Sequence, residues 1–163
     1  MDYERKMIYL CLAHMSEEGL EQKYIKEAFD TNWVVPLGPN VNAFEDDLKF
    51  FVGKDQQGLE KEVVALSAGT AAVHLALIAC GVKPGDEVCV QSFTFCASSH
   101  PITYLGATPV FIDSERETWN MDPELLEKAI IDRIEKTGKK PKAIIPVALY
   151  GMPYDCERIM AIA

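Results

Sequence analysis

The residues whose types are best suited to binding a ligand form the turn Ser67-Ala68-Gly69-Thr70. This turn leads from a short apolar run into a strongly apolar helical segment. A helix N-terminus presents unpaired backbone N–H groups and the positive end of the helix dipole, so it can hold a phosphate. Gly69 allows a ligand to approach the backbone closely, and the Thr70 hydroxyl adds a donor. The same residues can simply turn and cap a helix, and this stretch by itself leaves both interpretations open.

Other phosphate-binding loops do not fit this chain. The sequence contains no G-x-G and no G-x-x-x-x-G-K pattern. The apolar run 88–90 is followed by Gln91 and Ser92 rather than by the acidic residue that would bind a ribose. Binding of a dinucleotide or of ATP is therefore disfavoured.

A pair of aromatic residues, Phe93 and Phe95, follows the same run. Ligands of α/β sheets bind at the carboxyl ends of the strands, where Phe95 would leave the sheet and can stack on a flat heteroaromatic ring. The alternative is that both phenylalanines belong to the core. A phosphate site beside an aromatic face suits a phosphorylated aromatic cofactor, and pyridoxal phosphate is the main candidate.

Short apolar runs alternate with helical patterns in the segments that must position these residues. The runs typical of buried strands are 63–66, 88–90, 110–112 and 143–147, and the helical patterns cover 70–80, about 95–105, 123–137 and 155 onward. Asp122 with Pro123 predicts the start of the third of these helices, and Gly138 its end. Regular alternation predicts right-handed βαβ units, hence an α/β fold with a mostly parallel sheet flanked by helices.

Two further helices are predicted before the sheet region, over 17–30 and after Asn40, which is a good N-cap residue. The helix over 70–80 is apolar nearly all round, so we expect it to be central in the fold. The connection 32–39 between the first two helices is apolar and broken by proline and glycine. An apolar surface loop requires an explanation.

The amino-acid composition limits the kinds of partner that the protein can bind and indicates its cellular compartment. The chain has 163 residues, with 16 Lys and Arg against 25 Asp and Glu for a net charge of −9, which argues against nucleic-acid binding. No apolar run approaches the roughly 18 residues of a membrane span. The 5 cysteines are scattered and odd in number, which favours reduced thiols in a cytoplasmic protein, and the 3 histidines are too dispersed for a metal site.

Several short motifs follow one another along the chain. They are Asn32-Trp33-Val34-Val35-Pro36-Leu37-Gly38-Pro39, Ser67-Ala68-Gly69-Thr70-Ala71-Ala72, Gly85-Asp86-Glu87-Val88, Ser92-Phe93-Thr94-Phe95, Tyr104-Leu105-Gly106-Ala107 with Phe111-Ile112-Asp113, and Leu149-Tyr150-Gly151. Together these motifs resemble the DegT/DnrJ/EryC1/StrS family of pyridoxal phosphate-dependent nucleotide-sugar aminotransferases. The similarity is collinear from about Met7 to Ala163.

The resemblance implies the fold-type I aminotransferase architecture and a homodimer with active sites at the subunit interface. It assigns phosphate binding to Gly69 and Thr70 and ring stacking to Phe95. The residues it places against the sugar substrate are Asn32, Trp33, Val34, Val35 and Gly69. Ala148 departs from the polar residue usual before Leu-Tyr-Gly, and His74, although at a family position, is expected to be a core histidine.

The same resemblance implies transfer of an amino group, with glutamate as donor, to a nucleotide-linked keto sugar in bacterial glycan biosynthesis. The sequence resembles family members that act on UDP-4-keto-6-deoxy-N-acetylhexosamines, so this substrate is expected. One alternative is a sugar dehydratase of the same superfamily, with histidine in place of the cofactor lysine. Another is a non-catalytic module that binds a nucleotide sugar.

The lysine that bonds to the cofactor lies further along the chain in this family. No lysine here matches it, so it is expected beyond Ala163. Residues 1–163 would then be the N-terminal part of the large domain, with a helical segment and substrate loop at 1–53 and the βαβ region at 54–163. We expect this chain alone to be inactive and to self-associate through uncovered apolar surface.

Overall fold

The computed structural model describes residues 15–55 and 57–163, so predictions for Cys11 and His14 lie outside the described residues. The chain divides into two compact units, the first ending at Ala65 and the second formed by Leu66–Ala163. Each unit is described by itself.

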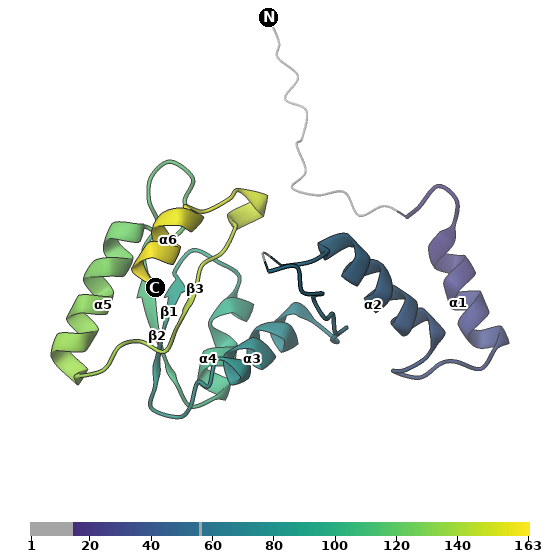
Figure 1. The fold of residues 1–163 in the computed structure, drawn as a ribbon, viewed down its shortest axis with the longest axis horizontal. Helices are drawn as coiled ribbons and strands as arrows, with labels where there is room; N and C mark the ends of the chain where they lie inside the picture. The colour runs from purple at the N-terminus through teal and green to yellow at the C-terminus, as the bar shows by residue number, and fades with distance from the viewer. Residues whose placement is uncertain (1–14, 56) are drawn as a thin grey trace, which may run out of the picture. The chain divides into compact units, whose positions relative to one another are not determined.

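The first unit contains the two predicted helices, α1 (Leu20–Asp30) and α2 (Pro39–Val52), shown in Figure 1. The expected N-cap at Asn40 is wrong, because α2 begins two residues earlier, with Gly38 as N-cap and Pro39 in the first turn. Proline suits that position, since its fixed φ is helical and the N–H that it lacks would have no partner there.

The second unit is built on a parallel sheet of three strands, β1 (Glu87–Gln91), β2 (Thr108–Ile112) and β3 (Ala143–Ile145). Their order is β2-β1-β3, and Cys89 of β1 pairs with Val110 on one side and Ile144 on the other. The predicted mostly parallel α/β fold is confirmed. The helical elements are α3 (Gly69–Ala79), η1 (Cys96–Ser98), α4 (His100–Tyr104), α5 (Pro123–Thr137), η2 (Leu149–Gly151) and α6 (Cys156–Ile162).

Helices cover both faces of the sheet, because successive side chains of a strand point to opposite faces. Val88 and Val90 of β1 pack with residues of α3 and α4, whereas Cys89 between them packs with residues of α5 and α6. Figure 1 shows α3 and α4 on one side of the strands and α5 on the other. The first core cluster is Leu77, Val82, Val88, Val90, Ile102 and Ala107, and the second is Cys89, Ile112, Met121, Leu126 and Ile159.

Both predicted ends of α5 are confirmed. The Asp122 side chain accepts hydrogen bonds from the N–H groups of Glu124 and Leu125, and Gly138 ends the helix with a φ of 71°. These signals are local, so they do not depend on the rest of the fold.

Other expectations about elements are wrong. The run 63–66 forms no strand, because it pairs with no neighbouring strand among the described residues, and Val64 is 67% exposed. The helix expected over 95–105 is split into η1 and α4, and β3 ends at Ile145, before Pro146, which has no N–H for a ladder bond. The helix expected to be central, α3, buries only Leu77, and Leu75 and Ile78 remain half exposed.

Within the described residues, no helix is both long enough and apolar enough to cross a membrane.

Candidate functional site

The N-terminus of α3 is open to solvent. Ala68, the N-cap, has an extended backbone, and its side chain makes no capping hydrogen bond. Gly69 is exposed, and a Cβ placed on it would meet no atom within 4 Å. The first-turn N–H groups of this 11-residue helix, with the hydroxyl of the partly buried Thr70, therefore form a donor set that can accept an anion.

Phe95 lies where the chain leaves β1 and is the N-cap residue of η1. The Thr94 and Ser98 hydroxyls share a hydrogen bond of 2.9 Å, and the Ser98 N–H donates to the Phe95 carbonyl at 3.0 Å. These bonds fix the turn, while the Phe95 ring remains 78% exposed. The ring is therefore not part of the core and is free to stack on a ligand.

The residues expected to bind pyridoxal phosphate lie in one unit, and the structure brings their elements together, since α3 packs against η1. N–H and hydroxyl donors suit phosphate oxygens, and an exposed phenyl ring suits a flat pyridine. By this chemistry the residues fit the cofactor. The space around Gly69 is open, since an added Cβ would meet no atom within 4 Å.

The predicted substrate loop begins at the C-terminus of α1. Asn32 adopts a left-handed conformation with a φ of 60°. Its N–H donates to the Phe29 carbonyl at 3.2 Å, and the Trp33 N–H donates to the Ala28 carbonyl at 2.8 Å. This pair of bonds is a Schellman motif, in which asparagine is one of the few residues other than glycine that fit the left-handed position. Helix α1 therefore fixes where Trp33 leaves it.

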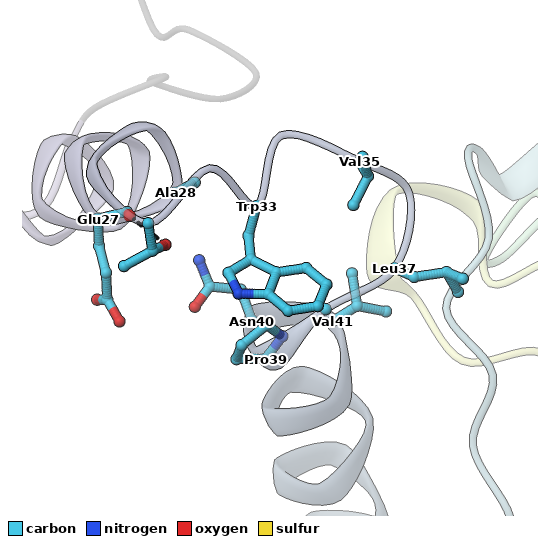
Figure 2. A pocket seen from close by; sticks show the side chains of 10 residues that line it. Glu27, Ala28, Trp33, Val35, Leu37, Pro39, Asn40 and Val41 are labelled. Atoms are coloured by element: carbon cyan, nitrogen blue, oxygen red, sulfur yellow. Dashed lines mark hydrogen bonds between the residues drawn. The ribbon is translucent and has the colours of Figure 1, made fainter.

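The Trp33 indole folds back over the start of α2, as Figure 2 shows, above Pro39, Asn40 and Val41. A Cβ at Gly38 would lie 2.9 Å from Cε3 of this ring, so only glycine allows the approach. The cavity beneath the ring has a volume of only ≈ 80 Å³, too small for a sugar. Trp33, Val34 and Val35 are each at least half exposed.

The predicted site residues thus fall into two groups. Gly69, Thr70 and Phe95 belong to the second unit, and Asn32–Val35 belong to the first. Each group is built by contacts within its own unit.

Comparison with known proteins identifies the family. The sequence model of the DegT/DnrJ/EryC1/StrS aminotransferase family matches residues 15–163. The chain belongs to this family. The predicted resemblance is therefore confirmed.

Three of its relatives show how far the similarity extends. EpsN of Bacillus subtilis (strain 168), named as a pyridoxal phosphate-dependent aminotransferase, is 50% identical over 157 residues, which cover 96% of this chain and 38% of EpsN. The UDP-2-acetamido-2-deoxy-3-oxo-D-glucuronate aminotransferase of Pseudomonas aeruginosa is 43% identical over 127 residues, covering 78% of this chain and 32% of that enzyme. The crystal structure of a family aminotransferase from Brucella abortus matches with a TM-score of 0.73 at 35% identity, over 92% of this chain and 41% of that one. The chain thus spans well under half the length of each of these family members.

The sequence predicted no role for Gln91. It showed only that Gln91 stands where a ribose-binding protein would have an acidic residue. In the structure its side chain is fully buried. Its amide nitrogen donates to the Phe93 carbonyl at 2.9 Å, and its oxygen accepts from the N–H groups of Met121 at 2.9 Å and Val147 at 3.3 Å. Gln91 therefore joins three chain segments at the carboxyl edge of the sheet. The available signal was a polar residue at the end of a buried apolar run.

Asn120 is a second buried amide that the sequence did not single out. It is 1% exposed, donates from Nδ2 to the Met152 carbonyl at 2.9 Å and accepts from the Leu149 N–H at Oδ1, also at 2.9 Å. It fixes the segment after β3 to the loop before α5.

His74 is partly buried on α3, and its ring forms a T-shaped pair with the ring of Tyr104, with centroids 5.6 Å apart. This packing is consistent with a structural role. Among residues 15–55 and 57–163, no group of three His, Cys, Asp or Glu side chains is placed to hold a metal ion.

Proposed function

We propose that this protein is a pyridoxal phosphate-dependent aminotransferase that acts on a nucleotide-linked keto sugar. The observation that carries the proposal is the open N-terminus of α3, with Gly69 and Thr70, in the same unit as the exposed Phe95 ring. Family membership supports it, as does the name of the Pseudomonas aeruginosa relative, which specifies a UDP-linked oxo sugar.

Each site residue has a role that its surroundings allow. The first-turn N–H groups of α3 and the Thr70 hydroxyl bind the phosphate, and Phe95 supports one face of the ring. Asn32, Trp33, Val34 and Val35 of the first unit are proposed to contact the sugar, as is Gly69 of the second unit. Pyridoxal phosphate, when bound, supplies the electron sink for amino-group transfer.

The substrate that we propose is a UDP-4-keto-6-deoxy-N-acetylhexosamine of bacterial surface-glycan synthesis, with glutamate as donor and a homodimer as the working unit. A cytoplasmic location is supported by the free thiols of Cys80, Cys89, Cys96 and Cys156. We further propose that residues 1–163 are the N-terminal part of the large domain, with the helical segment and substrate loop at 1–53 and the βαβ region at 54–163. The lysine that bonds to the cofactor would follow Ala163. The match to EpsN supports this, because it covers only 38% of the length of EpsN.

Cofactor binding tests the proposal directly. The 163-residue chain is titrated with pyridoxal phosphate, and binding is measured by equilibrium dialysis. Thr70→Ala and Phe95→Ala should each weaken binding about tenfold, which corresponds to about 1.4 kcal/mol.

Matched controls separate this site from general surface effects. Thr108→Ala changes an exposed threonine at the amino end of β2, and Phe111→Ala removes a ring that is 57% exposed on the same strand. Neither should change the affinity. Equal effects of site and control variants would refute the assignment of Thr70 and Phe95.

Activity tests the part of the proposal that concerns the lysine. With pyridoxal phosphate, glutamate and a UDP-linked keto sugar, the 163-residue chain should show no turnover. Catalytic turnover would show that the necessary groups are all present within residues 1–163.

A further inference from the structure

The loop between β2 and α5, residues 113–122, is closed at its base. Ser114 and Met121 form an isolated antiparallel bridge, and the Asp122 N–H donates to the Asp113 carbonyl at 3.0 Å. One step further in, the Glu115 N–H donates to the Asn120 carbonyl at 2.9 Å. Both ends of the loop are therefore held together.

The tip of this loop is held as well. The Glu115 carboxylate accepts hydrogen bonds from the Thr118 hydroxyl and from the N–H groups of Glu117 and Thr118. The bond from the Thr118 hydroxyl is the main reason that the pKa of Glu115 lies below its usual value. Asn120 anchors the far side of the loop through its bonds to Leu149 and Met152. The position between them, Trp119, is consequently well fixed.

Trp119 combines backbone strain with exposure. Its φ is +64°, a region in which a bulky residue is an outlier, and its side chain is 59% exposed. Burial therefore contributes little to offset the strain. Strained residues of this kind cluster at binding and catalytic sites. The Trp119 ring meets Phe93, itself 46% exposed, edge to face with centroids 5.9 Å apart.

The aromatic pair borders a cavity of ≈ 470 Å³, a volume in the range of small-molecule sites. The remaining lining residues are Asp113, Ser114, Glu115 and Arg116. The cavity lies where β1 and β2 end, at the edge of a parallel sheet where ligands bind.

The lining selects among possible ligands. Two carboxylates against one guanidinium give a net negative lining, which disfavours a diphosphate. A pyranose ring suits the cavity better, because its C–H faces pack on aromatic rings while its hydroxyl rim bonds to carboxylates and guanidinium.

We propose that Phe93 and Trp119 form an aromatic platform that binds the hexopyranose ring of the nucleotide-sugar substrate. The identity of the sugar rests on the proposed function. The platform itself rests on the cavity and on the exposed, strained tryptophan.

Ligand-observed NMR tests the platform on the 163-residue chain, with UDP-N-acetylglucosamine as the probe. Saturation transfer should be strongest at the hexose ring protons, and UDP alone should bind at least fivefold more weakly. Phe93→Ala should weaken binding of the probe at least fivefold. Equal binding of UDP and of the sugar nucleotide would overturn the proposal, as would the absence of binding.

A second set of variants separates binding from structural effects. Trp119→Gly and Trp119→Asn relieve the strain, since both residues tolerate a positive φ, so the melting temperature should rise by about 2–4 °C while binding weakens at least fivefold. Tyr150→Gly is the matched control, because Tyr150 is also an exposed aromatic residue with a φ of 51° but does not line the cavity. It should gain stability and keep its affinity. Unchanged affinity of both Trp119 variants would also overturn the platform.

This result can be told apart from failure of the proposed function. Binding of pyridoxal phosphate is measured separately, through the Thr70 and Phe95 variants. If the chain binds the hexose but not pyridoxal phosphate, the proposed aminotransferase function is rejected. If it binds pyridoxal phosphate but not the hexose, the aromatic platform is rejected.

Discussion

At the scale of single residues, Gln91 connects the end of β1 to two segments distant in sequence. One amide oxygen accepts both the Met121 and the Val147 N–H groups, while the amide nitrogen binds the Phe93 carbonyl. A leucine of similar size would leave all three backbone groups without this partner. Gln91 therefore stabilises the edge of the sheet from which Phe95 projects.

Replacing this amide should be costly. Gln91→Leu should lower the free energy of unfolding by about 2–4 kcal/mol, because each buried unsatisfied group costs about 1–3 kcal/mol and solvent relieves part of the total. Urea unfolding followed by circular dichroism measures the change. Ser92→Ala is the control, since the hydroxyl of this exposed neighbour makes only a 3.4 Å contact with Asp113. An equal, small effect of the two substitutions would contradict this account.

Cys89 offers a second test at this scale. Burial, helped by the nearby charge of Glu87, raises the pKa of the Cys89 thiol from 9.0 to about 11. The folded chain thus holds this proton more tightly than the unfolded chain, so the stabilising effect is complete below pH 9 and is lost as the pH rises to about 11.

The wild type should consequently lose stability faster than Cys89→Ala between pH 9 and 11, by no more than about 1.4 kcal/mol per pH unit, the limit set by one proton. Urea unfolding at several pH values gives both profiles, and the difference removes the effect of other titrating groups. Parallel profiles would show that burial does not perturb this thiol.

At the scale of elements, the start of α2 depends on the packing of Trp33 over Gly38. Gly38 has a φ of 134°, and an added Cβ would meet the Trp33 ring at 2.9 Å. Gly38→Ala should therefore destabilise the first unit by about 1–3 kcal/mol, from backbone strain and overpacking together. Chemical unfolding followed by circular dichroism reports the loss of helix.

Two comparisons separate these causes. Gly53→Ala is a control for backbone strain alone, since its φ is 61° and nothing lies within 4 Å of the added Cβ. The double variant Trp33→Ala/Gly38→Ala should recover the part due to the ring, a non-additivity expected only of residues in contact. Strict additivity would rule out the steric explanation.

An element can be predicted from the sequence when the residues that determine it lie close together in the chain. Both ends of α5 are predictable, since Asp122, Pro123 and Gly138 act within one helical turn. The run 63–66 gave a wrong prediction, because a strand requires a partner that its own sequence does not specify. For the candidate site, Thr70 and Phe95 could be proposed from their residue types and positions. The exposure of Phe95 could not, because it depends on how the turn after β1 packs.

Long-range bonds explain what the sequence could not predict. The partners of Gln91 lie 30 and 56 residues away, and those of Asn120 lie 29 and 32 residues away. No periodicity or spacing reveals such pairs. The positive φ of Trp119 is equally hidden, since tryptophan is a poor candidate for that conformation and only the closed loop around it imposes the strain.

At the scale of the whole molecule, two properties have opposite effects on self-association: exposed apolar side chains favour it, and net charge opposes it. Phe50 and Phe51 are neighbours on α2 and are 91% and 84% exposed, and other large apolar side chains on both units are also at least half exposed. Exposed apolar surface of this kind marks interaction sites or a tendency to aggregate. A net charge of −9 opposes association between copies of the chain.

The balance of these two effects predicts salt-dependent self-association. In size-exclusion chromatography with light scattering, the chain should shift to larger species as its concentration rises, and more so when salt is raised from about 0.01 to 0.15 M, because the screening length falls from about 30 to 8 Å. Phe50→Ser/Phe51→Ser should reduce the shift, whereas Glu157→Gln, which lowers the repulsion by one charge, should slightly increase it. A single monomeric species across all concentrations and salts would show that the exposed apolar side chains do not drive association.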